Sequence, residues 1–216
     1  MIDFYTWTTP NGRKISILLE ELAVPYRTIT VNLESGEQQR PEFLAINPNS
    51  KVPAIVDHDV AGHDVPGGPL SVFESGAILI YLAEKHGRFL STSPAVRAET
   101  LQWLMFQMSG IGPFLGQVNY WMNNAPEKIP QAIQRYLDES VRLMQVLNGA
   151  LAGRDFIAGE YSIADMAAYP WVAAAWGPFT ALLPDQVKAM PHVTAWIDRL
   201  GAREAVARGM AVPKVG

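Results

Sequence analysis

The chain has 216 residues, of which 49% are hydrophobic and 18% charged, so one compact body or two modest domains can form. With 17 basic and 21 acidic residues the formal net charge is −4, and no basic run could follow a phosphate backbone. We therefore expect no nucleic-acid partner. The absence of cysteine excludes disulfides, thiolate metal ligands and a cysteine nucleophile, so thiol chemistry would need a bound thiol.

The N-terminal residues 1–9 lack a basic segment followed by an apolar one, and no stretch approaches the roughly 18 apolar residues of a membrane span. We expect a cytoplasmic protein without a membrane partner. The histidines are scattered without the spacing of metal ligands, so we expect no metal site. They are His58, His63, His86 and His192.

The first part of the chain alternates strand and helix patterns. Residues 2–6 are β-prone, turn residues follow at 8–12, and apolar residues then recur at helical spacing until Pro25. Residues 26–33 read as a second strand. Next come a helical turn at 41–46, a strand at 54–57, a loop at 59–69, a strand at 70–73 and a helix from Glu74 to Gly87. The order is βαβ followed by ββα.

After residue 90 the strand patterns end, and helices are predicted at residues 94–122, 129–151, 162–176 and 191–200. The composition change at residues 88–94 places a domain boundary there, giving domains 1–87 and 88–216. Ser162 and Asp165 form a capping box, which we assign to folding. The tail from about Val206 is expected to fray or to lie on the surface.

Four stretches in this order resemble the glutathione S-transferase family. They are Thr9-Pro10-Asn11-Gly12-Arg13-Lys14, Asn47-Pro48-Asn49-Ser50-Lys51-Val52-Pro53, Phe73-Glu74-Ser75-Gly76-Ala77-Ile78 and Tyr161-Ser162-Ile163-Ala164-Asp165. The Thr9-Pro10-Asn11-Gly12 loop, together with residues 117–124 and 133–136, most resembles the bacterial nu class, which is similar to the yeast prion-forming nitrogen regulators. The resemblance implies a thioredoxin-like N-terminal α/β domain, an all-helical C-terminal domain and a homodimer.

In this family the loop after the first strand carries a residue that stabilises the thiolate of glutathione. The matching hydroxyl here is that of Thr9, assisted by the Asn11 amide, and a donor to the charged sulfur lowers its pKa. The structural alternative is a loop threonine followed by an asparagine that caps the helix. Tyr5 is a second candidate, because other classes use a tyrosine near this point, although it also alternates as any strand aromatic residue does.

The resemblance assigns the remaining contacts of glutathione. Pro53 matches a cis-proline that presents the backbone of Val52 to the cysteinyl group. Ser75 and the adjacent N–H groups would receive the γ-glutamyl carboxylate, and Glu74 its ammonium. An ordinary helix cap is the structural alternative for this pair.

Three further positions match binding residues of the family. Gln38 and Lys51 resemble residues that contact the glycyl carboxylate or the γ-glutamyl backbone, although polar loop residues are often only solvated. Arg135 resembles a residue that projects towards the partner subunit's glutathione, and a surface ion pair is its alternative.

The resemblance therefore implies a glutathione-dependent disulfide-bond reductase with glutathione transferase activity. Glutathione or glutathione disulfide is the expected cosubstrate, and a small disulfide or an electrophile the second substrate. The alternatives are a conventional transferase and a binding or regulatory protein of the same fold with little catalysis.

Overall fold

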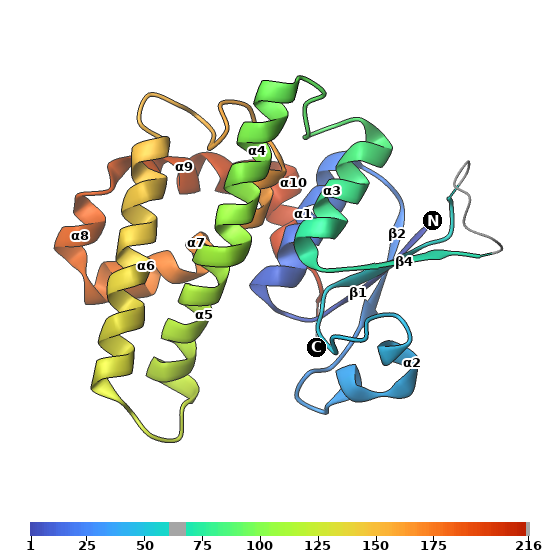
Figure 1. Cartoon of the computed structure of the whole chain (residues 1–216), viewed down its shortest axis with the longest axis horizontal. Coiled ribbons are helices and arrows are strands. Elements are labelled where there is room, and N and C mark those ends of the chain that lie inside the picture. The colour runs from blue at the N-terminus through green and yellow to red at the C-terminus, as the bar shows by residue number, and fades with distance from the viewer. Residues whose placement is uncertain (61–67, 215–216) are drawn as a thin grey trace. The chain divides into compact units, whose positions relative to one another are not determined.

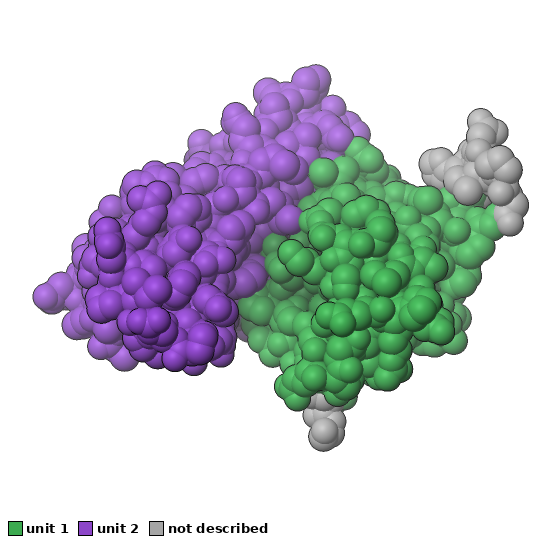
Figure 2. Space-filling model, turned by 60° about the horizontal axis from the view of Figure 1, so that its bottom comes forward, with its two compact units in different colours: residues 1–88, 204–216 green, residues 89–203 purple. Residues whose placement is uncertain are grey.

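The computed structural model describes residues 1–60 and 68–214. Most of the loop predicted at residues 59–69, including His63, lies outside the described part. The chain divides into two compact units, coloured separately in Figure 2. The first contains residues 1–88 together with the C-terminal segment that begins at Glu204, and the second is Phe89–Arg203.

The first unit is built on a four-stranded mixed sheet in the order β2-β1-β3-β4. Its strands are β1 (Ile2–Thr6), β2 (Tyr26–Thr30), β3 (Ala54–Asp57) and β4 (Leu70–Phe73). β1 and β2 run parallel, and β3 is antiparallel to both of its neighbours. This confirms the predicted βαβ-ββα order; the second strand ends at Thr30, three residues earlier than the apolar pattern suggested.

The first unit also contains helices, whose places around the sheet are shown in Figure 1. They are α1 (Pro10–Leu22), the turn η1 (Glu37–Gln39), α2 (Pro41–Leu44), α3 (Ser75–His86) and α10 (Glu204–Met210). Phe4 of β1 is fully buried, whereas the alternate residue Tyr5 packs against Phe43 of α2. The twofold alternation of a strand thus sends its side chains to two different layers.

The helix α10 corrects our expectation for the C-terminal tail. Instead of fraying, Glu204–Met210 packs against α1, where Val206 is buried and the Ser16 hydroxyl donates to the Gly209 carbonyl at 2.6 Å. Arg208 adds an ion pair to Glu20 of α1 at 2.7 Å. The predicted second domain of residues 88–216 therefore differs from the observed second unit at its C-terminal end.

We predict that Gly209→Ala lowers the free energy of unfolding by about 1–3 kcal/mol, the usual range for overpacking. A Cβ at this position would lie 2.6 Å from both the Cα and the N of Ile17, so α10 would have to move away from α1. Denaturation in urea measures the change. The control is Gly149→Ala near the end of α6, where the added Cβ meets nothing within 4 Å and should cause no loss. Equal stability of the two variants would contradict the close packing.

The second unit is helical throughout its described elements. They are α4 (Pro94–Phe106), η2 (Gln107–Ile111), α5 (Gly112–Asn119), η3 (Tyr120–Asn124), α6 (Pro130–Ala150), α7 (Ile163–Leu182), α8 (Pro184–Lys188) and α9 (Pro191–Gly201). The helix predicted at 94–122 is a continuous series of α- and π-helical segments. α7 continues past Pro178, where sequence reasoning had ended it at residue 176, and burial of Phe179 offsets part of the cost of that proline.

The capping box at the start of α7 is present as predicted. Ser162 accepts from the backbone N–H of Ala164, and the fully buried Asp165 accepts from the backbone N–H groups of Ser162 and Ile157. Asp165 also accepts from the indole N–H of Trp196 in α9 at 2.9 Å. Its role is therefore structural, since it joins α7, α9 and the preceding loop.

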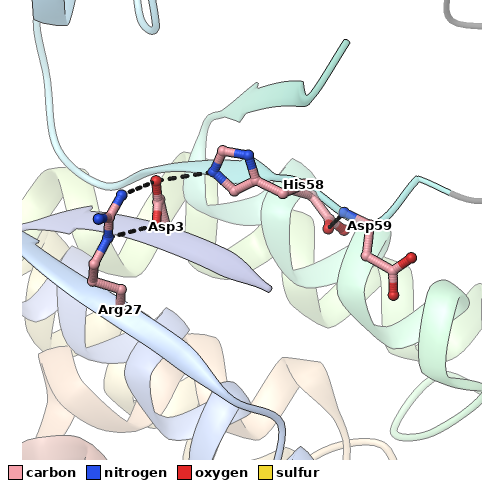
Figure 3. Close-up of polar contacts among 5 residues, drawn as sticks. Asp3, Arg27, His58 and Asp59 are labelled. Carbon is pink, nitrogen blue, oxygen red and sulfur yellow. Dashed lines mark hydrogen bonds and ion pairs between the residues drawn. The ribbon is translucent and has the colours of Figure 1, made fainter.

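A charged cluster lies near the N-terminal end of β1 (Figure 3). The buried Asp3 carboxylate accepts two hydrogen bonds from Arg27, at 2.6 and 2.9 Å, and one from His58 at 2.9 Å. The bidentate contact with Arg27 lowers the pKa of Asp3; burial opposes this, and His58 adds to the lowering. The cluster joins β1 to β2 and to the end of β3.

We predict that Asp3→Asn lowers the free energy of unfolding at neutral pH and makes it depend less on pH in the acid range. The folded pKa of Asp3 is lower than the unfolded value of 3.8, so its contribution is present above pH 3.8 and disappears as pH falls through the folded pKa. Thermal unfolding between about pH 2 and pH 7 tests this. The exposed neighbour Asp59→Asn is the control, and an unchanged acid slope in Asp3→Asn would contradict the assignment.

Candidate active site at one edge of the sheet

The segments that contain the predicted binding motifs adjoin strand ends at the same edge of the sheet. Tyr5, near the end of β1, pairs with Ala54 at the start of the antiparallel β3, and Ala54 pairs with Phe73 at the end of β4. Strand ends that are paired in this way lie side by side. The loop containing Thr9, the turn before Ala54 and the start of α3 therefore emerge next to one another, although they are far apart in the sequence.

Thr9 caps the first helix. Its Oγ1 accepts a hydrogen bond from the backbone N–H of Gly12 at 3.1 Å, and Pro10 is the first helical residue. Thr9 is therefore the N-cap of α1. Asn11, which the alternative interpretation made the cap, lies in the first turn of the helix. A hydroxyl has two lone pairs and one hydrogen, so the cap uses a lone pair of Thr9 and not its donor.

Gly12 allows the start of α1 to pass close to the end of β1. A Cβ at this position would lie 2.2 Å from Thr6 Oγ1 and 2.9 Å from the carbonyl oxygen of Trp7. Only glycine fits this approach. The glycine of the motif therefore fixes where the hydroxyl of Thr9 stands relative to the sheet.

Tyr5 lies in an apolar layer between β1 and α2. Its ring is 6.1 Å from that of Phe43, and it packs against a cluster that includes Val31 and Val52. Burial is the main cause of the raised pKa of its hydroxyl. A pocket of about 400 Å³ adjoins Tyr5 between β1, β2 and α2. These surroundings suit a packing role, and Thr9 stays the preferred donor.

The loop before β3 is organised by Asn47. This side chain is 2% exposed, donates to the carbonyl of Lys51 at 2.6 Å and accepts from the backbone N–H of Asn49 at 2.9 Å. The peptide bond between Val52 and Pro53 is cis, as the family resemblance implied. Val52 is buried, while the Lys51 side chain is exposed at the surface beside it. Asn47 is the first residue of the second family motif, in which no role was predicted for it.

Gln38 is joined to the same loop, because the Ser50 hydroxyl donates to its backbone carbonyl at 2.8 Å. The side-chain amide oxygen of Gln38 is buried and has no hydrogen-bond partner among the described residues. An unsatisfied buried acceptor calls for an explanation, and a donor on a bound molecule is one. The structure therefore places Gln38 beside the loop, but its predicted contact with glutathione stays a prediction.

Glu74 has a backbone conformation that is unusual for its type. It precedes α3 with φ 68° and ψ 116°, and its side chain makes no capping hydrogen bond. A positive φ at a residue other than glycine costs on the order of 1–3 kcal/mol. The exposed carboxylate instead accepts from the Asn49 side chain at 3.2 Å. An ordinary helix cap does not account for this residue.

Ser75 is the first residue of α3 and is 4% exposed. Its Oγ lies 3.3 Å from the ammonium nitrogen of Lys14, which is only 1% exposed. Lys14 is the last residue of the first family motif, and no role was predicted for it. The signal of its burial was its spacing, because Lys14, Leu18 and Leu22 are four residues apart and share the buried face of α1. Burial lowers the pKa of Lys14 to about 7, and the negative charge of Glu74 opposes that shift.

The second unit contributes one predicted site residue. Arg135 is an exposed residue of α6, one turn before Glu139. Because it belongs to the other unit, the geometry of the first unit does not test its role. Over residues 1–60 and 68–214, no cluster of three or more His, Asp or Glu side chains could hold a metal ion. No helix in the same ranges is long and apolar enough to cross a membrane.

The chain is similar to known proteins over most of its length. Residues 2–84 match the family description "Glutathione S-transferase, N-terminal domain", and residues 130–199 match "Glutathione S-transferase, C-terminal domain". The disulfide-bond oxidoreductase YfcG of Escherichia coli is 49% identical over 217 residues, covering 100% of this chain and 97% of that protein.

Two solved structures are similar over nearly the whole chain. A glutathione transferase family member from Pseudomonas fluorescens, solved with two glutathione molecules, has a TM-score of 0.90 and 44% identity, covering 98% of this chain and 93% of that one. A glutathione transferase from Pseudomonas putida, solved with one glutathione disulfide per subunit, has a TM-score of 0.90 and 43% identity, covering 99% and 92%.

The four-stranded mixed sheet with a cis-proline before β3, together with the helical second unit, is the fold class that the family resemblance implied. The chain belongs to the glutathione S-transferase family. The predicted family and fold class are confirmed, and its relatives include a protein named a disulfide-bond oxidoreductase, as the nu-class resemblance implied.

Proposed function

We propose that this chain is a glutathione-dependent disulfide-bond reductase that also conjugates glutathione to electrophiles. The observation that carries the proposal is the convergence of three segments at one edge of the sheet. These are the helix start at Thr9, the cis-proline turn at Val52-Pro53 and the α3 start at Glu74-Ser75. They come from distant parts of the sequence and offer complementary groups for one extended tripeptide.

Each segment suits one part of glutathione. The backbone of Val52 would pair with the cysteinyl group, and Ser75 with the N–H groups at the start of α3 would receive the γ-glutamyl carboxylate. Glu74 would accept the ammonium, which gives a reason for its strained backbone. Gln38 and Lys51 would contact the remaining polar groups of the tripeptide.

Thr9 and Asn11 would stabilise the thiolate. The Thr9 hydroxyl keeps its donor while its oxygen caps α1, so it can serve the fold and the sulfur together. A donor that binds the charged form of a thiol lowers the thiol pKa. The positive end of α1 acts in the same direction.

The lack of cysteine determines how disulfide reduction must proceed, because both electrons have to come from glutathione. The bound glutathione thiolate attacks one sulfur of the substrate disulfide, forming a mixed disulfide and releasing the other sulfur as a thiolate. A second glutathione thiolate then attacks the glutathione sulfur of the mixed disulfide and releases the remaining substrate thiol. Two glutathiones are oxidised to glutathione disulfide, and one disulfide is reduced to two thiols.

The similar proteins support this reaction. One is named a disulfide-bond oxidoreductase, one was solved with two glutathione molecules and one with glutathione disulfide. Two glutathione molecules are the reductant that the two steps consume, and glutathione disulfide is the product that the second step forms. The proposal also includes a cytoplasmic homodimer in which Arg135 reaches the partner subunit's glutathione.

The test is glutathione-dependent reduction of 2-hydroxyethyl disulfide by the purified chain, coupled to glutathione reductase. We expect a rate above the uncatalysed reaction that survives earlier treatment of the protein with iodoacetamide, because the chain has no cysteine to alkylate. Conjugation of chlorodinitrobenzene should be weaker. A protein free of glutaredoxin that conjugates rapidly without reducing the disulfide is a conventional transferase, and one that does neither is a binding protein.

A further inference from the structure

The pocket of about 400 Å³ between β1, β2 and α2 has its own set of lining residues. Its apolar walls come from Tyr5 of β1, Ile29 of β2, Phe43 of α2 and Ile46, which follows α2. Tyr5 and Ile29 are partners across the two strands, so their side chains lie on the same face of the sheet. None of the lining residues is among those proposed to hold glutathione or its thiolate. The pocket is therefore a candidate for a different ligand.

Two aromatic rings form one corner of this pocket. The rings of Tyr5 and Phe43 are 6.1 Å apart and are inclined to each other by 53°. The negative face of an aromatic ring attracts a cation that comes within about 6 Å of its centre. Burial raises the pKa of the Tyr5 hydroxyl, which is therefore neutral at neutral pH and can accept a hydrogen bond through its oxygen. This corner suits an ammonium group.

The charges around the pocket favour the same sign of ligand. Its charged lining residues are Glu37, Arg40 and Glu42, and Arg40 pairs with Glu37 at 3.2 Å. Within the described ranges, Glu42 has no ion-pair partner. Further along the same face of the sheet, Arg27 is offset by Asp3 at 2.6 Å (Figure 3). One negative charge is therefore in excess at the pocket.

We propose that this pocket binds a small organic cation with an apolar body, of the arylalkyl ammonium class. The apolar body would fill the space against Ile29 and Ile46, where its burial is favourable. The ammonium would lie towards the aromatic corner and the carboxylate of Glu42. An anion of the same size would instead be repelled by Glu42. The site does not depend on the proposed glutathione function, because the two share no residue.

The experiment titrates the full chain with three small probes, 2-phenylethylammonium, 2-phenylethanol and phenylacetate. They share a phenyl ring and differ in the charge of the polar end. Shifts of the backbone amides of β2 and α2 in NMR spectra give the dissociation constants. The variants are Glu42→Gln, Glu42→Lys and Ile29→Trp, the last of which fills the pocket. Glu127→Lys is the control, because it makes the same change of net charge at an exposed residue between η3 and α6.

We expect wild type to bind 2-phenylethylammonium with a dissociation constant of about 1 mM, as suits so small a ligand. 2-Phenylethanol should bind about 5-fold more weakly, and phenylacetate more weakly still. Glu42→Gln should remove most of the advantage of the cation, and Glu42→Lys should make phenylacetate the tighter ligand of the two ions. Glu127→Lys should keep the wild-type order. Salt at about 0.5 M should reduce the differences between the probes.

Ile29→Trp should lose binding of all three probes, and Glu42, being exposed, keeps the test valid if that variant does not fold. Saturating S-methylglutathione should leave the affinity for 2-phenylethylammonium unchanged. Equal affinity for the three probes, no binding, or an unchanged preference in Glu42→Lys would overturn the inference. Amide shifts that avoid β2 and α2, or displacement of the cation by S-methylglutathione, would also overturn it, because the ligand would then occupy another site.

Discussion

Replacing Thr9 with valine is expected to lower the rate of glutathione-dependent disulfide reduction by about 100-fold, the low end of the loss seen when a single donor to a developing anion is removed. The dissociation constant for glutathione should change much less, because the hydroxyl acts mainly on the ionised sulfur. Titrating the thiolate absorbance of bound glutathione should show a raised thiol pKa. Asn11→Ala is expected to lower the rate and to raise the thiol pKa, as Thr9→Val does.

The cap that Thr9 provides for α1 requires its own controls. Thr9→Val also removes the acceptor for Gly12, which costs about 1 kcal/mol of stability. Thr9→Asp keeps a capping acceptor but puts a negative charge beside the sulfur, so it should be folded and inactive. Thr9→Ser keeps the oxygen that caps α1 and the hydroxyl that would donate to the sulfur, so it should retain activity. Full activity in Thr9→Val, together with a large loss in Tyr5→Phe, would transfer the role to Tyr5.

The start of α3 gives the second large effect. Ser75→Ala is expected to weaken glutathione binding about 30-fold, because losing one partner of a buried charged contact costs on the order of 2 kcal/mol. Glu74→Gln should weaken it similarly by removing the charge that faces the ammonium. Calorimetry measures both changes, and an unchanged dissociation constant in Ser75→Ala would mean that the ligand binds elsewhere.

Glu74→Gly separates binding from stability. Glycine tolerates a positive φ at much lower cost, so this variant should be more stable than Glu74→Gln by up to about 1 kcal/mol while also failing to bind glutathione tightly. Urea denaturation of the two variants measures the difference. If Glu74→Gly is the less stable of the two, the strain at this residue is not what the backbone angles indicate.

Local patterns in the sequence predicted most of the fold. The alternation around Phe4, the apolar spacing of α1 and the capping box at Ser162 depend on residues within one or two turns of each other, and the structure has all three. The family motifs likewise predicted the cis peptide bond before Pro53, which no spacing rule could have indicated.

Features that depend on distant residues were missed. The tail from about Val206 was expected to fray or to lie on the surface, yet Glu204–Met210 is a helix packed against α1, and Gly209 allows its close approach to Ile17. α7 continues through Pro178, although the local rule favours a stop at that residue. In both cases the gain from packing exceeds the local preference.

The sequence by itself determined the βαβ-ββα order, the helical second half, the exclusion of protein thiol chemistry and the motifs that could hold glutathione. Only the tertiary structure decided that Glu74 has a positive φ and that Lys14 lies buried against Ser75. The first set follows from periodicity and composition, which are properties of neighbouring residues. The second depends on strand pairing and burial, which bring residue 14 to residue 75 and exclude water from the contact.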